Sequence, residues 1–77
     1  MAIYKYGNYL IQRQDAIFDQ VSHPATTTPA SGVYRCEGCG ISAVSTKGHP
    51  LPPQNHHQHT SQQGAIRWRL VVMSTHA

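Results

Sequence analysis

The sequence predicts a small, mostly β domain that a bound metal ion stabilises, with a short helix near its N-terminus. A chain of 77 residues lies in the size range where one apolar core contributes little net stability without a staple such as a metal. Two cysteines stand between two short β-prone runs, and a later segment alternates apolar and polar side chains. A histidine-rich loop separates these two parts and supplies further metal-binding side chains.

The N-terminal third, residues 1–31, predicts an arm with one short helix followed by a linker. Residues 1–11 are rich in tyrosine and isoleucine and contain a Gly-Asn pair, so a short strand and an irregular arm both fit. Over residues 14–21 the apolar side chains fall on one helical face, namely Ile17, Phe18 and Val21. Residues 24–31, PATTTPAS, have little to bury and are typical of an extended linker.

Residues 32–73 predict the folded domain, followed by a tail at 74–77. Over residues 32–44, two β-prone runs flank a glycine-containing turn, which indicates a hairpin with cysteines at its tip. Residues 65–73, AIRWRLVVM, place two arginines on one face and four apolar side chains on the other, namely Ile66, Trp68, Leu70 and Val72. This period of two is that of a half-buried strand.

The loop over residues 47–64 contains three prolines and four histidines and almost no aliphatic side chains. It cannot fold by burying apolar area, and it exceeds the ~12–15 residues beyond which loops in compact domains are functional or disordered. We therefore expect a bound ligand to hold it in place.

Zinc binds thiolate and imidazole ligands in a tetrahedron, and two short ligand pairs on separate turns satisfy that geometry. Cys36 and Cys39 form the first pair, and Gly38 and Gly40 can adopt the positive φ values that such a turn often needs. The outer histidines of the run HHQH form the second pair. The spacing Cys36-x2-Cys39-x16-His56-x2-His59 falls within zinc-binding patterns, whose separators run about 12–20 residues.

Three histidines compete for two ligand positions in this loop. Neighbouring side chains of an extended segment point to opposite faces, so His56 and His57 are not expected to bind one ion together without a turn. We favour His56 with His59, followed by His57 with His59, and expect the remaining imidazole to support the ligands or the backbone. The predicted cofactor is one Zn²⁺ ion, with iron as the alternative. His49 is a minor candidate, and His23 and His76 are expected to be exposed.

Other interpretations compete with a metal site. The histidines can form an exposed polar loop beside two thiols, or Cys36 and Cys39 can serve as a redox pair, although such pairs usually begin a helix in a βαβ unit. Zinc-dependent hydrolysis needs an open coordination position and a nearby base. Only Glu37, Asp15 and Asp19 offer carboxylates, so an enzymatic role is not favoured.

The formal net charge of +3 permits nucleic-acid contact without demanding it. Basic side chains can line one side of the sheet, and Tyr34 or Trp68 can stack on a base if exposed. Burial of Trp68 in the core is the favoured alternative. No stretch reads as a secretory signal or as ~20 apolar residues that span a membrane, which indicates a cytoplasmic protein without a membrane partner.

Three runs carry a resemblance to known proteins: TPASGVYRCEGCG, STKGHPLPPQNHHQH and IRWRLVV. Together they resemble a group of small bacterial proteins of unassigned function, some of them labelled "protein L" without relation to the immunoglobulin binder, and more broadly a zinc ribbon. The resemblance covers about residues 24–72 and implies a ribbon-like fold but no activity. In the usual ribbon a second Cys-x-x-Cys follows the prolines, where Gln54 and His57 stand here. Gln54 is no zinc ligand, which leaves the histidine pair open and keeps His57 as a candidate.

The function predicted from these observations is that of a zinc-binding structural and interaction module. A protein partner is expected ahead of nucleic acid, although the partner itself cannot be read from the sequence. A nucleic-acid-binding zinc ribbon is the first alternative, and a thiol redox protein using Cys36 and Cys39 is the second.

Overall fold

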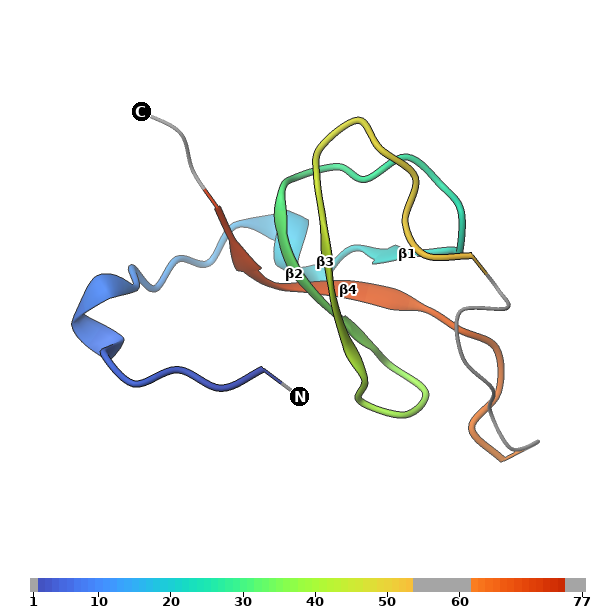
Figure 1. Cartoon of the computed structure of the whole chain (residues 1–77), viewed down its shortest axis with the longest axis horizontal. Helices are drawn as coiled ribbons and strands as arrows, with labels where there is room; N and C mark the ends of the chain where they lie inside the picture. The colour runs from blue at the N-terminus through green and yellow to red at the C-terminus, as the bar shows by residue number, and fades with distance from the viewer. Residues whose placement is uncertain (1, 54–61, 75–77) are drawn as a thin grey trace.

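Four antiparallel strands form one sheet in the computed structural model, which describes residues 2–53 and 62–74. The strand order is β1-β4-β2-β3 (Figure 1). The strands are β1 Val21–Ser22, β2 Gly32–Cys36, β3 Ser42–Ser45 and β4 Trp68–Met73. Within the described ranges the only helices are two short 3-10 turns, η1 Gly7–Tyr9 and η2 Ala16–Asp19. The predicted mostly β class is confirmed.

Strands β2 and β3 form the predicted hairpin, in register from Gly32 opposite Ser45 to Arg35 opposite Ser42. Strand β4 lies on the other side of β2 and places Trp68 directly opposite Cys36. The register of this pair shifts between Val33 and Tyr34. The alternation predicted over 65–73 is confirmed for Ile66, Trp68 and Leu70, which are buried. Beyond the register shift it does not hold, since Met73 rather than Val72 packs against the core. Regular pairing begins only at Trp68.

One face of β2 and β4 carries the core. Side chains two apart on a strand share a face, and Tyr34 and Cys36 of β2 meet Trp68 and Leu70 of β4 in this way. Across the described residues, the buried cluster consists of Ala30, Tyr34, Cys36, Leu51, Ile66, Trp68 and Leu70. The interpretation of Trp68 as a core residue is therefore confirmed.

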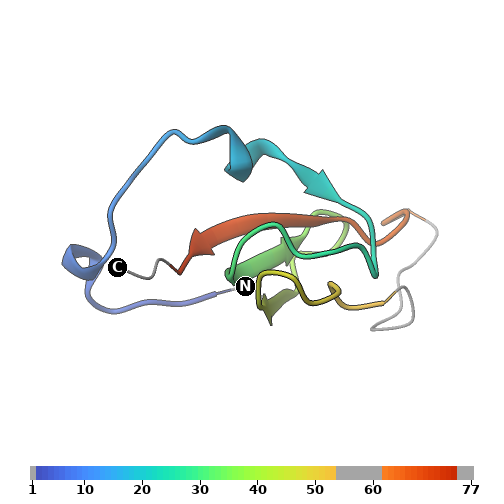
Figure 2. The same ribbon diagram turned by 90° about the horizontal axis from the view of Figure 1, so that it is seen from above.

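The expected helix over residues 14–21 is reduced to the single turn η2. Ile17 and Phe18 do pack against the core from this turn, but Val21 pairs with Arg69 as part of β1. Because β1 draws residue 21 into extended backbone, the helix cannot continue. The N-terminal segment passes along the β1 side of β4 (Figure 2), and residues 2–6 precede η1 as an irregular arm.

The expectation that residues 24–31 bury little is wrong. Thr28 and Ala30 are both buried, and the segment forms an irregular ladder with residues 48–52. The Thr28 amide donates to the His49 carbonyl at 2.8 Å, and the Leu51 amide donates to the Thr26 carbonyl at 2.8 Å. This ladder anchors the chain immediately before the histidine run.

Candidate metal centre

The two cysteines lie in the turn that joins β2 to β3, which we call the cysteine turn, residues 36–40. The Cys36 amide donates to the Ile41 carbonyl and the Gly40 amide donates to the Cys36 carbonyl, each at 2.8 Å. Gly40 has φ of +84°, a left-handed conformation that glycine adopts without steric cost. Gly38 is not among the positive-φ residues, so only one of the two expected glycine conformations is present.

The cysteines differ in burial. The Cys36 side chain is 0% exposed and belongs to the core, whereas Cys39 is half-buried and packs against the edge of that core. Neither forms a disulfide. The turn therefore presents one thiol from inside the fold and one from its surface, three residues apart.

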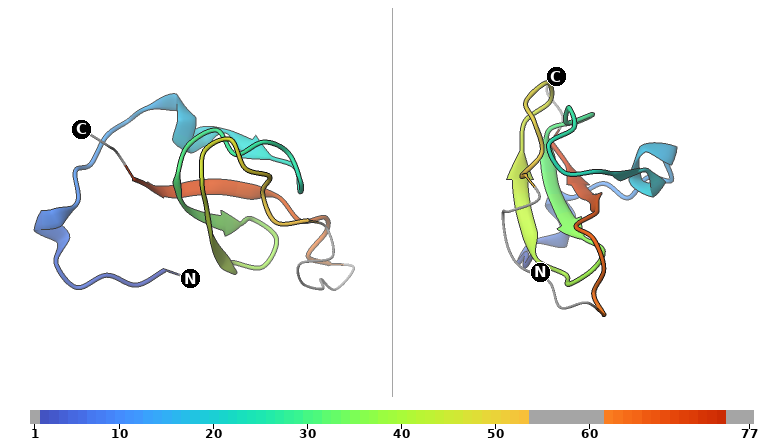
Figure 3. Two further views of the ribbon diagram at one scale, coloured as in Figure 1. Left: turned by 45° about the horizontal axis from the view of Figure 1, so that its top comes forward. Right: turned by 90° about the vertical axis from the view of Figure 1, so that its right-hand side faces the viewer.

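A hydrogen bond ties the cysteine turn to the chain segment that follows the histidine loop. The Glu37 amide donates to the Arg67 carbonyl at 2.8 Å. The views in Figures 1 and 3 agree, since the tip of the hairpin lies beside the segment that leads into β4. Ile66 belongs to the same segment, and its side chain is buried in the core, which also holds the segment in place. The fold thus brings the cysteine turn and the segment before β4, distant in sequence, to one end of the sheet.

Charged side chains surround the same turn on the face opposite the core. Glu37 accepts from the Arg35 guanidinium, with 2.9 Å between Nη1 and Oε1. Its other carboxylate oxygen lies 3.4 Å from Arg69 Nη1. The one carboxylate of the turn is therefore held between two arginines from two strands.

The predicted ligands His56, His57 and His59 lie outside the described residues, so their part in the site stays a prediction. Within residues 2–53 and 62–74, no group of three or more His, Cys, Asp or Glu side chains is arranged to hold a metal. His23 and His49 are both exposed, as expected for His23. Of the predicted ligand set, the described part of the chain contains the two cysteines, which would make up half of a tetrahedral zinc site.

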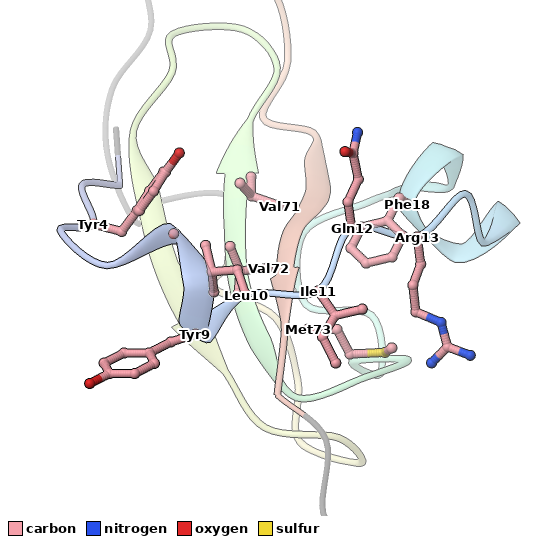
Figure 4. A pocket seen from close by; sticks show the side chains of 11 residues that line it. Tyr4, Tyr9, Leu10, Ile11, Gln12, Arg13, Phe18, Val71, Val72 and Met73 are labelled. Carbon is pink, nitrogen blue, oxygen red and sulfur yellow. The ribbon is translucent and has the colours of Figure 1, made fainter.

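A cavity of about 670 Å³ lies between the arm and β4, and none of the sequence motifs predicted it. Figure 4 shows Leu10, Ile11, Val72 and Met73 together in its centre, with Phe18 and Arg13 at one end. The sequence feature that could have predicted this cavity is the concentration of large apolar residues before residue 12. The fold leaves these residues exposed.

Neither aromatic residue considered for base stacking is available on the surface. Tyr34 is 1% exposed and Trp68 is 0% exposed. Stacking of nucleic-acid bases requires an accessible ring face. The arginines nearest the site, Arg35 and Arg69, are partly neutralised by Glu37.

Comparison with known proteins finds a similar bacterial protein. The chain is 54% identical over 50 residues to Protein L of Escherichia coli. The match covers 65% of this chain and 56% of Protein L, so the chain spans little more than half the length of that relative. No family model matches, and neither does any solved structure.

In the part of the chain that the structure describes, no helix has the length and apolar character needed to cross a bilayer. The resemblance to bacterial proteins called protein L is confirmed by the match. The zinc-ribbon part of that resemblance remains a prediction, because no family model or solved structure supports it.

Proposed function

We propose that this protein is a zinc-binding structural and interaction module. One Zn²⁺ ion is held by Cys36, Cys39 and two of the three histidines His56, His57 and His59. The observation that carries the proposal is the position of the cysteine turn at the tip of a hairpin, hydrogen-bonded to the segment that follows the histidine loop. A single ion at this end of the sheet would join the hairpin and the loop.

A structural role for the ion follows from the donor set. Two thiolates and two neutral imidazoles balance the charge of a divalent ion and fill a tetrahedral site, leaving no open position for substrate. In such sites the apparent binding free energy of zinc is about 10–16 kcal/mol, enough to decide between folded and unfolded chain. Iron is the alternative metal for this ligand set.

The N-terminal arm supports the interaction part of the proposal. Ile3 is 96% exposed, Ile11 87% and Tyr9 77%. Large apolar residues that gather on an exposed surface mark interaction sites. Residues 2–14 also include Lys5 and Arg13 and no acidic residue. The complementary partner is a protein with an apolar surface bordered by acidic side chains.

The partner proposal can be tested with a photo-crosslinking residue at position 9 of the full chain in cells. We expect a protein adduct that disappears when Lys5 and Arg13 are both replaced by glutamate. A crosslinker at Val44, which is exposed on β3, serves as the matched control and should not give that adduct. Adducts that are the same at both positions, or that contain only nucleic acid, would contradict the proposal.

Metal content tests the zinc proposal itself. Elemental analysis of purified protein should give one equivalent of zinc, and Cys36→Ser and His59→Ala should both lose it. His23→Ala and His49→Ala replace exposed histidines of the described chain and should keep a full equivalent. Absence of any metal from the unmodified protein would overturn the proposal.

The nucleic-acid and redox functions remain the two alternatives. Burial of Tyr34 and Trp68 removes the stacking surface that nucleic-acid binding was expected to use. The cysteine turn joins two strands, whereas redox-active pairs of this spacing usually begin a helix. Both observations favour the structural zinc site.

A further inference from the structure

Arg35 and Arg69 lie directly opposite one another on β2 and β4. Like charges in facing positions of an antiparallel pair are destabilising. Glu37 relieves this repulsion, because its two carboxylate oxygens bind the two guanidinium groups at 2.9 Å and 3.4 Å. The three side chains together carry one net positive charge.

The ion pairs of Glu37 with Arg35 and Arg69 are not a main contribution to the free energy of unfolding. The side chains of Arg35, Glu37 and Arg69 are 38%, 23% and 42% exposed. Ion pairs with this access to water contribute at most about 1 kcal/mol each. The position of the carboxylate indicates its role better than the energy of its ion pairs does. Glu37 lies inside the cysteine turn, directly after Cys36.

We propose that Glu37 is the positioning residue of the metal centre, an inference that rests on the zinc-binding function proposed above. Its carboxylate holds the cysteine turn to β4 through Arg69, and its amide holds the turn to Arg67. Both contacts fix the cysteine turn relative to β4 and to the residues directly before it, the part of the described chain that follows the histidine loop in sequence.

Glu37 acts through the turn and is not itself a ligand. Successive side chains of a strand point to opposite faces, and Cys36 points into the core while Arg35 lies on the other face. The Glu37 carboxylate is engaged on the arginine face. Both of its oxygens are therefore directed away from the Cys36 sulfur, and it determines where the sulfurs lie.

The test compares Glu37→Gln with Asp15→Asn in the full-length, zinc-loaded protein. Asp15 is the matched control, because it is also a carboxylate two residues from an arginine, paired with Arg13 at 3.8 Å, but lies outside the cysteine turn. Groups that orient metal ligands typically change metal affinity by roughly 10- to 100-fold when replaced. We expect a loss of that size, measured by chelator competition, for Glu37→Gln and none for Asp15→Asn.

A spectroscopic readout separates positioning from a loss of stability. The visible absorption bands of the Co²⁺-substituted protein report the geometry of the sulfur ligands, and we expect them to shift in Glu37→Gln. Arg69→Gln keeps the Arg35–Glu37 pair and should give a smaller shift and a smaller loss of affinity, which tests the inference even if Glu37→Gln fails to fold.

The two proposals fail in different ways. If the unmodified protein binds no zinc, the proposed function is wrong. If it binds zinc and both Glu37→Gln and Arg69→Gln keep its affinity and its cobalt spectrum, only the role of Glu37 is wrong.

Discussion

Cys36 in β2 lies directly opposite Trp68 in β4, and neither side chain is exposed to solvent. One member of the cysteine pair is thus part of the hydrophobic core, next to the only tryptophan of the chain. A metal bound at Cys36, as proposed above, would be attached to a fully buried part of the sheet.

The difference in burial between the cysteines predicts unequal thiol reactivity. Thiol modification requires access to the sulfur, so in the folded, zinc-loaded protein Cys39 should react with a maleimide before Cys36, and removal of zinc should bring the two rates together as the chain unfolds. Bound zinc should protect both. Mass spectrometry of labelled peptides over time measures the order, and equal rates at both cysteines in the zinc-loaded protein would contradict the arrangement described above.

Tyr34→Phe should destabilise the fold. The buried Tyr34 hydroxyl donates to the Ala30 carbonyl at 2.6 Å and accepts from the Ala30 amide at 3.3 Å. Its loss leaves buried backbone groups without a partner, at a cost of about 1–3 kcal/mol in the free energy of unfolding. Tyr9→Phe, at an exposed position, is the control and should change that free energy little.

The same residue predicts a pH dependence. Burial raises the pKa of Tyr34 above its usual value of 10.0, and the hydrogen bond with Ala30 lowers it by less. The folded state therefore favours the neutral phenol, and this contribution is complete below the unfolded pKa and is lost as pH rises through the folded pKa. Chemical denaturation above pH 10 should narrow the stability difference between wild type and Tyr34→Phe. A stability difference that stays constant above pH 10 would contradict the raised pKa of Tyr34.

Thr28 and Ser45 form a buried hydroxyl pair with 2.5 Å between their oxygens. Thr28→Val should cost roughly 1–3 kcal/mol, because the buried Ser45 hydroxyl then loses its hydrogen-bond partner. The double variant Thr28→Val with Ser45→Ala removes both groups and should recover part of that loss. A double-mutant cycle measured by urea denaturation checks this, and additive losses would show that the pair is not coupled.

Gly32 is the position least tolerant of a side chain. A Cβ atom there would collide with the Val72 carbonyl oxygen of β4, so Gly32→Ala must shift the backbone of two central strands. We expect a loss of roughly 1–3 kcal/mol. Gly7→Ala, where the nearest atom is a tyrosine side-chain carbon at 3.4 Å, should be nearly neutral. Thermal denaturation compares the two, and similar midpoints would argue against the close β2–β4 contact.

The local sequence pattern was sufficient to predict some elements of this fold. The alternation around Trp68 predicted the face that β4 buries, and the β-prone runs around Cys36 and Cys39 predicted the hairpin. Long-range pairing decided the rest. Val21 leaves the predicted helix because Arg69, 48 positions later, offers it a strand partner. Thr28 is buried because Ser45 satisfies its hydroxyl, and nothing in PATTTPAS indicates that partner.

The candidate site, too, could be predicted from local sequence only in part. The Cys-x-x-Cys spacing identified the turn, since the two cysteines are close together in sequence. The arginine contacts of Glu37 depend on the register of β2 against β4, which local sequence does not specify. The histidine pair stays a prediction, because its residues lie outside those described.

The most direct test of the central claim is the far-ultraviolet circular dichroism and Trp68 fluorescence of the purified protein during exhaustive chelation under reducing conditions. A single zinc ion that joins the cysteine turn to the histidine loop predicts cooperative unfolding as zinc is removed and recovery when one equivalent is returned. A protein that keeps its β-sheet signal and its buried tryptophan emission with no metal bound would contradict the account.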